Sequence, residues 1–208
     1  TLGGTFAGNP VGSDSNEDES ITAGDLSCTV RLLLFGVNDP CAAVGRSGAK
    51  ASLSLPTALS VQDGVAQVPV HFTANGNQAA ALAMALEIDE AQVAFDAGDN
   101  NGDGLPDGLQ LVLDGGFQAM AVYKAGLLNL VIFSPELKAL ADGTLATLSL
   151  AVASGNSDSP AVRFSASQPA SAGGVDGATV PVQIDNDAVG GVNQPAQQLR
   201  LFLPTVGR

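Results

Sequence analysis

Acidic and other oxygen-bearing side chains alternate along one short segment near the N-terminus, residues 14–25. Its candidate metal ligands are Asp14, Asn16, Asp18, Ser20, Thr22 and Asp25. They fall at positions 1, 3, 5, 7, 9 and 12 of a loop of the kind that wraps Ca²⁺, a hard cation that takes six to eight oxygens. Position 6 of such loops is normally Gly, and Glu19 stands there, which would weaken binding or distort the loop. The spacing predicts a calcium site; an acidic, solvated linker is the alternative.

A second segment, DNNGDGLPD at residues 99–107, repeats the pattern over a shorter span. Its candidate ligands are Asp99, Asn101, Asp103, the carbonyl of Leu105, and Asp107. Gly104 stands at position 6, where a sharp turn is required. The spacing predicts a second structural calcium ion, between two strands. The alternative is the hydrophilic tip of a hairpin.

The chain has two cysteines, Cys28 and Cys41, and it begins at Thr1 without a Met or a signal peptide. This start suggests a processed, exported protein, although a chain shortened at its N-terminus would look the same. Two thiols in an exported chain favour one disulfide, with two buried unpaired thiols as the alternative. We therefore expect an extracellular protein, either secreted or at the cell surface.

The charge and hydropathy of the chain exclude two classes of partner. The net charge is −13, and so acidic a surface repels phosphate backbones, which makes nucleic acid an unfavourable partner. The sequence has no apolar run of the roughly 18 residues that a membrane span requires, so no membrane span is expected.

Few residues are suited to catalysis. His71 is the sole histidine and lies within an alternating segment, and the two cysteines are expected to be paired. The carboxylates of Glu87, Asp89 and Glu90 lie together at the expected entry to a loop, where a solvated role is the simpler interpretation. With no Trp and only Tyr123, the chain lacks the aromatic platforms of sugar-binding clefts. We expect no enzymatic activity.

One helix is expected, over residues 23–36, directly after the first acidic loop. Leu26, Val30, Leu33 and Leu34 fall on one face at helical spacing, and Gly36 is a natural stop. This pattern predicts an amphipathic helix.

From residue 49 onward the period changes from helical to alternating. Ten short runs are expected as strands, and they span residues 50–55, 65–73, 80–89, 92–96, 109–114, 117–123, 127–133, 144–152, 161–166 and 180–184. Turn signals such as Asn75-Gly76 and Asp142-Gly143 separate them. The pattern predicts a mainly β protein, an antiparallel sandwich of about nine or ten strands, with Leu82, Met84, Leu86 and Ile88 sharing one face.

Three segments are expected: a calcium-loop and helix segment at 1–48, the sandwich at 49–185, and a linker with an apolar tail at 186–208. In the tail, Leu199, Leu201 and Leu203 would share one face of a strand. Such a strand can add to the sheet edge of a neighbouring molecule. A strand docked on its own sandwich, or a frayed end, are the alternatives.

Two of these segments resemble a known pairing of families. Residues 14–36, DSNEDESITAGDLSCTVRLLLFG, resemble one calcium-binding half of a dockerin. Residues 49–185 resemble a cohesin-type domain, most clearly in VAQVPVHFTANGNQAAALAMALEID and FSPELKALADGTLATLSLAV. The resemblance implies a nine-stranded jelly-roll sandwich, no catalysis and a face that binds protein. Dockerins normally carry two calcium loops, and a single one precedes this cohesin-like part.

Two hypotheses on function follow. In the first, the chain is a structural protein that associates with other copies of itself, head to tail, into a filament or surface polymer. In the second, it is a cell-surface scaffold or a protein- or carbohydrate-binding module that recruits other secreted proteins. Whether the half-dockerin packs on its own sandwich or on a neighbour stays open.

Overall fold

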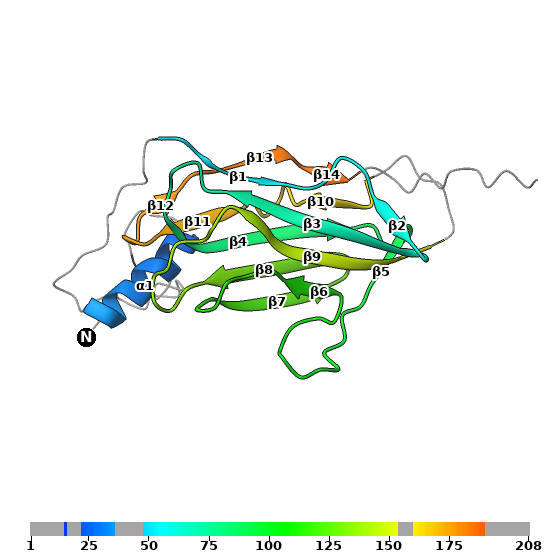
Figure 1. Cartoon of the computed structure of the whole chain (residues 1–208), viewed down its shortest axis with the longest axis horizontal. Coiled ribbons are helices and arrows are strands. Elements are labelled where there is room, and N and C mark those ends of the chain that lie inside the picture. The colour runs from blue at the N-terminus through cyan, green and yellow to red at the C-terminus, as the bar shows by residue number, and fades with distance from the viewer. Residues whose placement is uncertain (1–14, 16–21, 36–47, 154–159, 190–208) are drawn as a thin grey trace, which may run out of the picture.

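The computed structural model describes residues 15, 22–35, 48–153 and 160–189 of the chain. Within them lie one helix and fourteen strands, and the strands form two sheets that face each other (Figure 1). The predicted mainly β, jelly-roll sandwich is confirmed. The helix found among these residues lacks the length and apolar character needed to cross a membrane.

Sheet A contains seven strands, in the order β13-β1-β3-β9-β5, with β2 paired to β3 and β6 paired to β9. Its strands are β1 (Ala51–Ser54), β2 (Ser60–Gln62), β3 (Val65–Thr73), β5 (Val93–Phe95), β6 (Leu109–Leu111), β9 (Gly143–Val152) and β13 (Val182–Asn186). All its pairs are antiparallel except β1 with β13, which is parallel. The parallel pair departs from the expected purely antiparallel arrangement, because β13 returns to the start of the sandwich alongside β1.

Sheet B also contains seven strands. They are β4 (Ala79–Ile88), β7 (Gln118–Lys124), β8 (Leu127–Phe133), β10 (Val162–Phe164), β11 (Ser171–Gly174), β12 (Thr179–Val180) and β14 (Ala188–Val189). β4 pairs with β8 along one side and with β10 and β11 along the other, while β7 lies beyond β8. The short strands β2, β11 and β14 were not expected from the sequence, and the expected run 180–184 is divided between β12 and β13. Because β14 pairs with β10, the sheet continues through Val189, past the expected boundary at 185.

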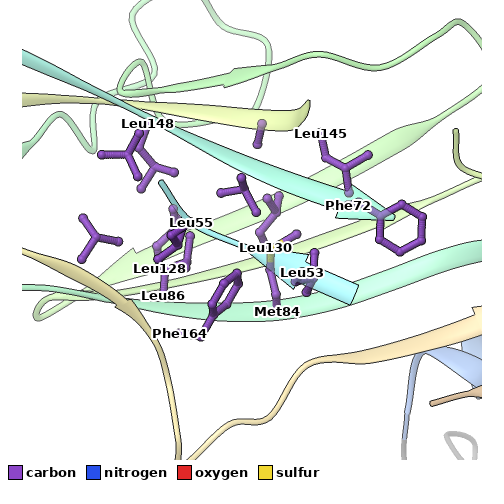
Figure 2. Close-up of a cluster of buried hydrophobic side chains, with 14 of the residues drawn as sticks. Leu53, Leu55, Phe72, Met84, Leu86, Leu128, Leu130, Leu145, Leu148 and Phe164 are labelled. Carbon is purple, nitrogen blue, oxygen red and sulfur yellow. The ribbon is translucent and has the colours of Figure 1, made fainter. Parts of the chain in front are cut away.

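The core lies between the two sheets. On β4, every second side chain points into it. Leu82, Met84, Leu86 and Ile88 are all buried on one face, as predicted. Figure 2 shows Met84 and Leu86 close to Leu128 and Leu130 of β8, with Leu53, Phe72, Leu145 and Leu148 contributed by sheet A. Burial of these apolar side chains away from water is the main driving force that holds the sheets together.

The helix α1 (Ala23–Phe35) begins with a capping box. The hydroxyl oxygen of Thr22 accepts a hydrogen bond of 3.0 Å from the N–H of Gly24, and the Asp25 carboxylate accepts one of 2.6 Å from the N–H of Thr22. The other carboxylate oxygen of Asp25 accepts from the N–H of Ser15 at 2.8 Å. These bonds satisfy backbone donors that would otherwise be left without a partner at the helix start.

The first turns of α1 pack on the outer face of sheet B, the face that points away from the core. The N–H of Ala23 donates to the hydroxyl of Ser171 at 3.1 Å, and the guanidinium of Arg31 donates to the carbonyl of Val175 at 3.3 Å. At Gly173 the backbones approach so closely that an added Cβ would lie 2.1 Å from the carbonyl oxygen of Ala23. A glycine is therefore required at 173 for the helix to dock.

The apolar face of the helix is covered only in part, since Leu26 and Val30 are half-buried. The buried residues of α1 are Ala23, Gly24, Asp25, Ser27 and Cys28, all from its first half. Leu33 and Leu34 are exposed, because the helix touches the sheet with its N-terminal turns and its far end projects beyond it (Figure 1). Small side chains allow close approach at the contact, so the leucine spacing did not indicate which residues pack.

Candidate protein interface

The outer face of sheet B carries small or apolar side chains along its three longest strands. On β4 the outward positions Ala81, Ala83 and Ala85 leave a shallow surface, and α1 covers the end of the sheet nearest Gly173. Beyond the helix, the register places Met120 of β7 opposite Val131 of β8, and Val131 opposite Ala83. The centre of the outer face therefore carries no charged side chain on these three strands.

Four side chains make up what we call the β7–β8 patch: Met120, Val122, Val131 and Phe133. Met120 is 59% exposed and Val122 is 63% exposed, although both belong to an alternating strand whose other face packs on the core. Sequence reasoning missed this patch. The signal was present in FQAMAVY, where both alternating faces are apolar, but a strand apolar on both faces resembles one that is simply buried.

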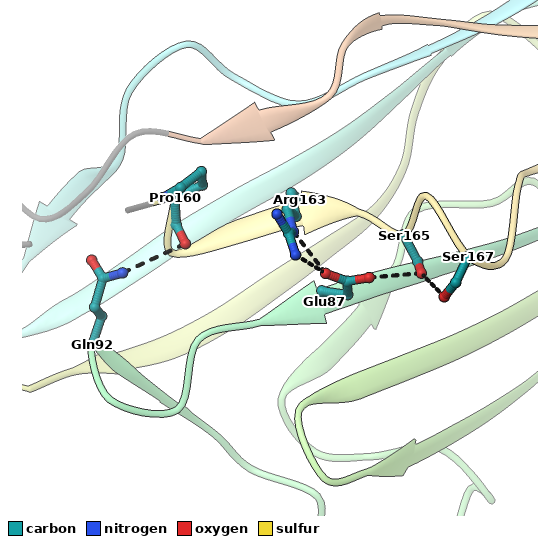
Figure 3. A network of polar contacts seen from close by, with 6 residues as sticks. All are labelled: Glu87, Gln92, Pro160, Arg163, Ser165 and Ser167. Atoms are coloured by element: carbon teal, nitrogen blue, oxygen red, sulfur yellow. Dashed lines mark hydrogen bonds and ion pairs between the residues drawn. The ribbon is translucent and has the colours of Figure 1, made fainter. Parts of the chain in front are cut away.

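A polar network fixes the end of the outer face that lies away from α1. The guanidinium of Arg163 on β10 donates to Glu87 on β4 at 2.6 Å, and the hydroxyl of Ser165 donates to the other carboxylate oxygen at 2.8 Å (Figure 3). These groups hold the pKa of Glu87 below its usual value, first through the Ser165 hydrogen bond and then through Arg163. Glu87 is thus a fixed anion beside the patch, and its role is to tie β10 to β4.

Tyr123 anchors the strand that carries Met120 and Val122. Its ring lies 4.9 Å from that of Phe95, and its hydroxyl donates a hydrogen bond of 2.6 Å to Glu90. Burial raises the pKa of Tyr123 to about 12, and the adjacent Glu90 carboxylate adds to the rise. Because Tyr123 points inward while its neighbours on β7 point outward, this contact holds the exposed patch in place.

The second acidic loop forms a turn held by hydrogen bonds that its predicted ligands make to backbone N–H groups. The N–H of Gly104 donates to Asp99 at 3.1 Å, and the N–H of Asp103 donates to the side-chain oxygen of Asn101 at 3.0 Å. Gly104 has a φ of +82°, the left-handed conformation that the turn requires. Leu105, whose carbonyl is a predicted ligand, is the next residue in the chain. This donor set of carboxylate, amide and carbonyl oxygens suits Ca²⁺ in type.

Asp107 contacts Asn100, which is not one of the predicted ligands. Its carboxylate accepts hydrogen bonds from both the backbone and the side-chain amide of Asn100. In the part of the chain that the structure describes, no three His, Cys, Asp or Glu side chains gather closely enough to hold a metal ion. The calcium prediction at 99–107 therefore depends on the mixed oxygen set and stays a prediction.

For the first acidic loop, only Thr22 and Asp25 of the predicted ligands lie within the described residues. Asp14, Asn16, Asp18 and Ser20 lie outside them, as does Glu19. Both carboxylate oxygens of Asp25 accept backbone N–H groups, from Ser15 and from Thr22. Asp25 therefore caps the helix, and its role as a calcium ligand stays a prediction.

The predicted disulfide and tail also extend beyond the described residues. Cys28 is fully buried in α1 and is not a free cysteine, whereas its predicted partner Cys41 lies outside the described part, so the pairing stays a prediction. The tail leucines Leu199, Leu201 and Leu203 lie outside it as well. His71 is an exposed residue of β3 whose ring nitrogen lies 3.1 Å from the hydroxyl of Thr144 on the neighbouring strand.

A groove of about 370 Å³ opens between β13 and the segment that links β10 to β11. Its lining is apolar apart from Ser165 and two carboxylates; the residues are Phe164, Ser165, Ala166, Pro169, Ala170, Val182, Ile184, Asp185 and Asp187. In the sequence, the pair Asp185 and Asp187 reads as a solvated exit from the last strand. That interpretation missed the groove, because its apolar walls come from segments that are distant in sequence.

The raised pKa of Tyr123 gives a direct test of how β7 is anchored. The chain has one Tyr and no Trp, so ultraviolet absorbance reports the ionisation of this residue alone. We expect a midpoint near pH 12 in the folded protein. Glu90→Gln should lower the midpoint but leave it above the ordinary value of about 10, because burial is the larger cause. The stability gained from the neutral phenol should be complete below about pH 10 and lost as pH rises from there through the folded pKa. A midpoint near pH 10 in the native protein would contradict the contact.

Comparison with known proteins supports the fold. No protein-family model and no curated protein matches this sequence. Among solved structures, the sixth cohesin of scaffoldin B from Acetivibrio cellulolyticus, in complex with a Cel5 dockerin mutant, matches with a TM-score of 0.51 and 19% identity over 68% of this chain and 99% of that one. A type II cohesin from Bacteroides cellulosolvens matches with a TM-score of 0.50 and 12% identity, over 68% and 98% of the two chains. The second type II cohesin module of the ScaA adaptor scaffoldin of Acetivibrio cellulolyticus gives 0.51 and 15%, over 72% and 92%. The chain therefore has a cohesin-like sandwich fold.

Proposed function

We propose that this chain is a non-catalytic, extracellular protein-binding module that takes a partner protein on the outer face of sheet B. The observation that carries the proposal is the β7–β8 patch, in which Met120 and Val122 are more than half exposed on an otherwise acidic molecule. Contiguous apolar side chains at a surface cost solubility and commonly mark sites of protein association. Met and aromatic side chains are also enriched at the centres of such interfaces.

The surroundings of the patch suit a rigid interface. The strands beneath it pack on the core, Tyr123 holds β7, and the Glu87–Arg163 ion pair borders the face at one end. A surface that is already ordered loses little conformational entropy when it binds. The opposite end of the face is covered by α1, so a partner would contact β7 and β8 rather than β11.

The chemistry of the partner is suggested by the fold neighbours. One of the cohesin structures is a complex with a dockerin. We propose that the partner of this chain is of the same kind, a compact helical module with an apolar face, recruited to a cell surface or to a secreted complex. A scaffold role of this type requires no catalysis by the chain itself.

The half-dockerin interpretation of residues 14–36 enters the proposal as a built-in part of the module. Its helix contacts its own sandwich through Ala23, Ser171 and Gly173. This contact favours the alternative in which the segment packs on the chain that carries it. The segment would then shape the binding face and leave the β7–β8 patch for a different molecule.

Self-association is a second candidate function, and one observation favours it. β13 is the last strand at its side of sheet A, and in the described residues its ladder partner is β1 alone. An edge strand of this kind has backbone groups available for another strand. The tail leucines Leu199, Leu201 and Leu203 would supply one, which would join copies head to tail into a filament.

Calcium has a structural role in either case. Two bound ions would offset part of the net charge of −13 and would hold together loops whose carboxylates repel one another. Asp99, Asn101 and Asp103, with the carbonyl of Leu105, would hold the ion in the second loop. Asp25 and Thr22 would be among the ligands of the ion in the first loop.

The binding face can be tested with two substitutions on β7. Met120→Asp and Val122→Asp should leave the fold intact, because both side chains are exposed, and should weaken partner binding by about 2 kcal/mol or more, the usual loss at a central interface residue. The measurement is calorimetric titration against a panel of purified dockerin modules. Val61→Asp, at an exposed apolar position on β2 of sheet A, is the matched control. If no dockerin binds the native chain, or if the β7 variants bind as well as the control, the proposed face is wrong.

The calcium proposal predicts a melting temperature that depends on the ion. An ion bound only to the folded state, at 100 times its Kd, adds about 2.7 kcal/mol to the free energy of unfolding. Chelator should therefore lower the melting temperature, and Asp99→Asn with Asp103→Asn should reduce that response. Asp63→Asn, at an exposed turn position that belongs to neither loop, should keep it. An unchanged melting temperature in chelator would count against both ions.

The self-association proposal is tested by removing the tail. Deletion of residues 199–208 should leave a folded monomer and abolish polymer, because the added strand is lost. Analytical ultracentrifugation and electron microscopy of the native and shortened chains provide the comparison. Filaments of the same repeat from the shortened chain would rule out the tail as the connector.

A further inference from the structure

We propose that the groove beside β13 is the acceptor site for residues 199–203 of a second copy of the chain, which enter it as an added strand. This inference rests on the self-association proposed above and names the site at which it happens. Three features carry it: the shape and lining of the groove, the open edge of β13, and the charge of the tail.

The groove has the size and lining of a site for a few apolar side chains. Its volume of about 370 Å³ lies near the lower end of the range of roughly 300–1,000 Å³ typical of ligand pockets. Phe164, Val182 and Ile184 line it, and Ile184 remains 37% exposed although its neighbours on β13 pair with β1. An apolar side chain that enters would complete the burial of this isoleucine.

β13 offers the backbone for an added strand. Its pairing with β1 runs from Val182 to Asn186, and the carbonyl of Pro181 is bonded to Ala51 on that same side. Since successive residues of a strand direct their backbone groups to opposite sides, alternate residues of β13 direct theirs away from β1. A strand laid along this edge would gain ladder hydrogen bonds and would also cover the groove.

The tail matches the groove in charge as well as in hydrophobicity. After Asp187 the chain contains no Asp or Glu, and it carries Arg200 and Arg208, in a molecule whose net charge is −13. Asp185 and Asp187 stand at the rim of the groove. In a strand that places Leu199, Leu201 and Leu203 on one face, Arg200 lies on the opposite face, toward water and the rim carboxylates.

The connecting segment is long enough for the tail to reach a second copy. The last described strand ends at Val189, and residues 190–198 separate it from Leu199. A hairpin that returned the tail to its own β13 would need about two to five residues. A spacer of this length spans about 30 Å when extended, which suits a bridge between two molecules.

A charge exchange in the full-length protein tests the acceptor. Asp185→Arg with Asp187→Arg makes the rim positive, and Arg200→Glu makes the tail negative. Each variant alone should self-associate about tenfold or more weakly than the native chain, because like charges then meet. An equimolar mixture should restore polymer, since each rim then finds a tail of opposite charge. Sedimentation velocity provides the measurement, and circular dichroism checks that each variant is folded.

The matched control carries the same change in charge away from the groove. Asp114→Arg with Glu136→Arg alters two exposed acids and should leave self-association as in the native chain. If the rim variant associates like this control while the tail deletion still abolishes polymer, the acceptor is wrong and the self-association proposal stands. If the native chain stays monomeric and Arg200→Glu lowers its melting temperature, the tail binds its own molecule and the second-copy proposal is overturned.

Discussion

The sandwich depends on the inward packing of β4, the strand with the largest number of paired neighbours in sheet B. β8 lies along one side of it and β10 and β11 lie along the other, so its register sets the register of the whole sheet. Because successive side chains of a strand point to opposite faces, the observed register places Leu82, Met84 and Leu86 in the core and leaves alanines on the outer face. A slip by one residue would exchange the two sets, and the core would lose its large side chains.

The same alternation determines the character of the outer surface. With Ala81, Ala83 and Ala85 pointing outward, the middle of sheet B is shallow enough for α1 to approach at Gly173. On the part of the face that α1 does not cover, the larger side chains of β7 and β8 form the exposed patch. The helix and the patch therefore share one face, and any protein partner of that face would lie beside the N-terminal segment.

The two surfaces differ in physical character. The β7–β8 patch is broad and apolar, with the Glu87–Arg163 pair at its border, and is suited to a folded partner. The groove beside β13 is lined by apolar side chains and by two exposed carboxylates and lies next to a strand edge, which suits an extended peptide. The groove lies between β13 of sheet A and the segment that links β10 to β11 of sheet B, whereas the patch lies on β7 and β8.

The sequence determined the class of fold because alternation at period two survives in each long strand. Runs such as 65–73 and 127–133 appear in the structure as β3 and β8, and the helix after the first acidic loop ends at Phe35, one residue before the glycine expected to stop it. The oxygen spacing of 99–107 also predicted a turn at Gly104, because local backbone geometry there depends on neighbouring residues alone.

Tertiary structure alone decided which surfaces are exposed and which are covered. Leu33 and Leu34 of α1 carry a helical apolar pattern, yet the contact is made by Ala23 and Ser27 because Gly173 admits only a close, small-residue approach. The parallel pairing of β13 with β1, and the groove it forms with Phe164, join segments more than a hundred residues apart or on different sheets. Short-range patterns determine local conformation, whereas the neighbours of a given face depend on how the whole chain closes.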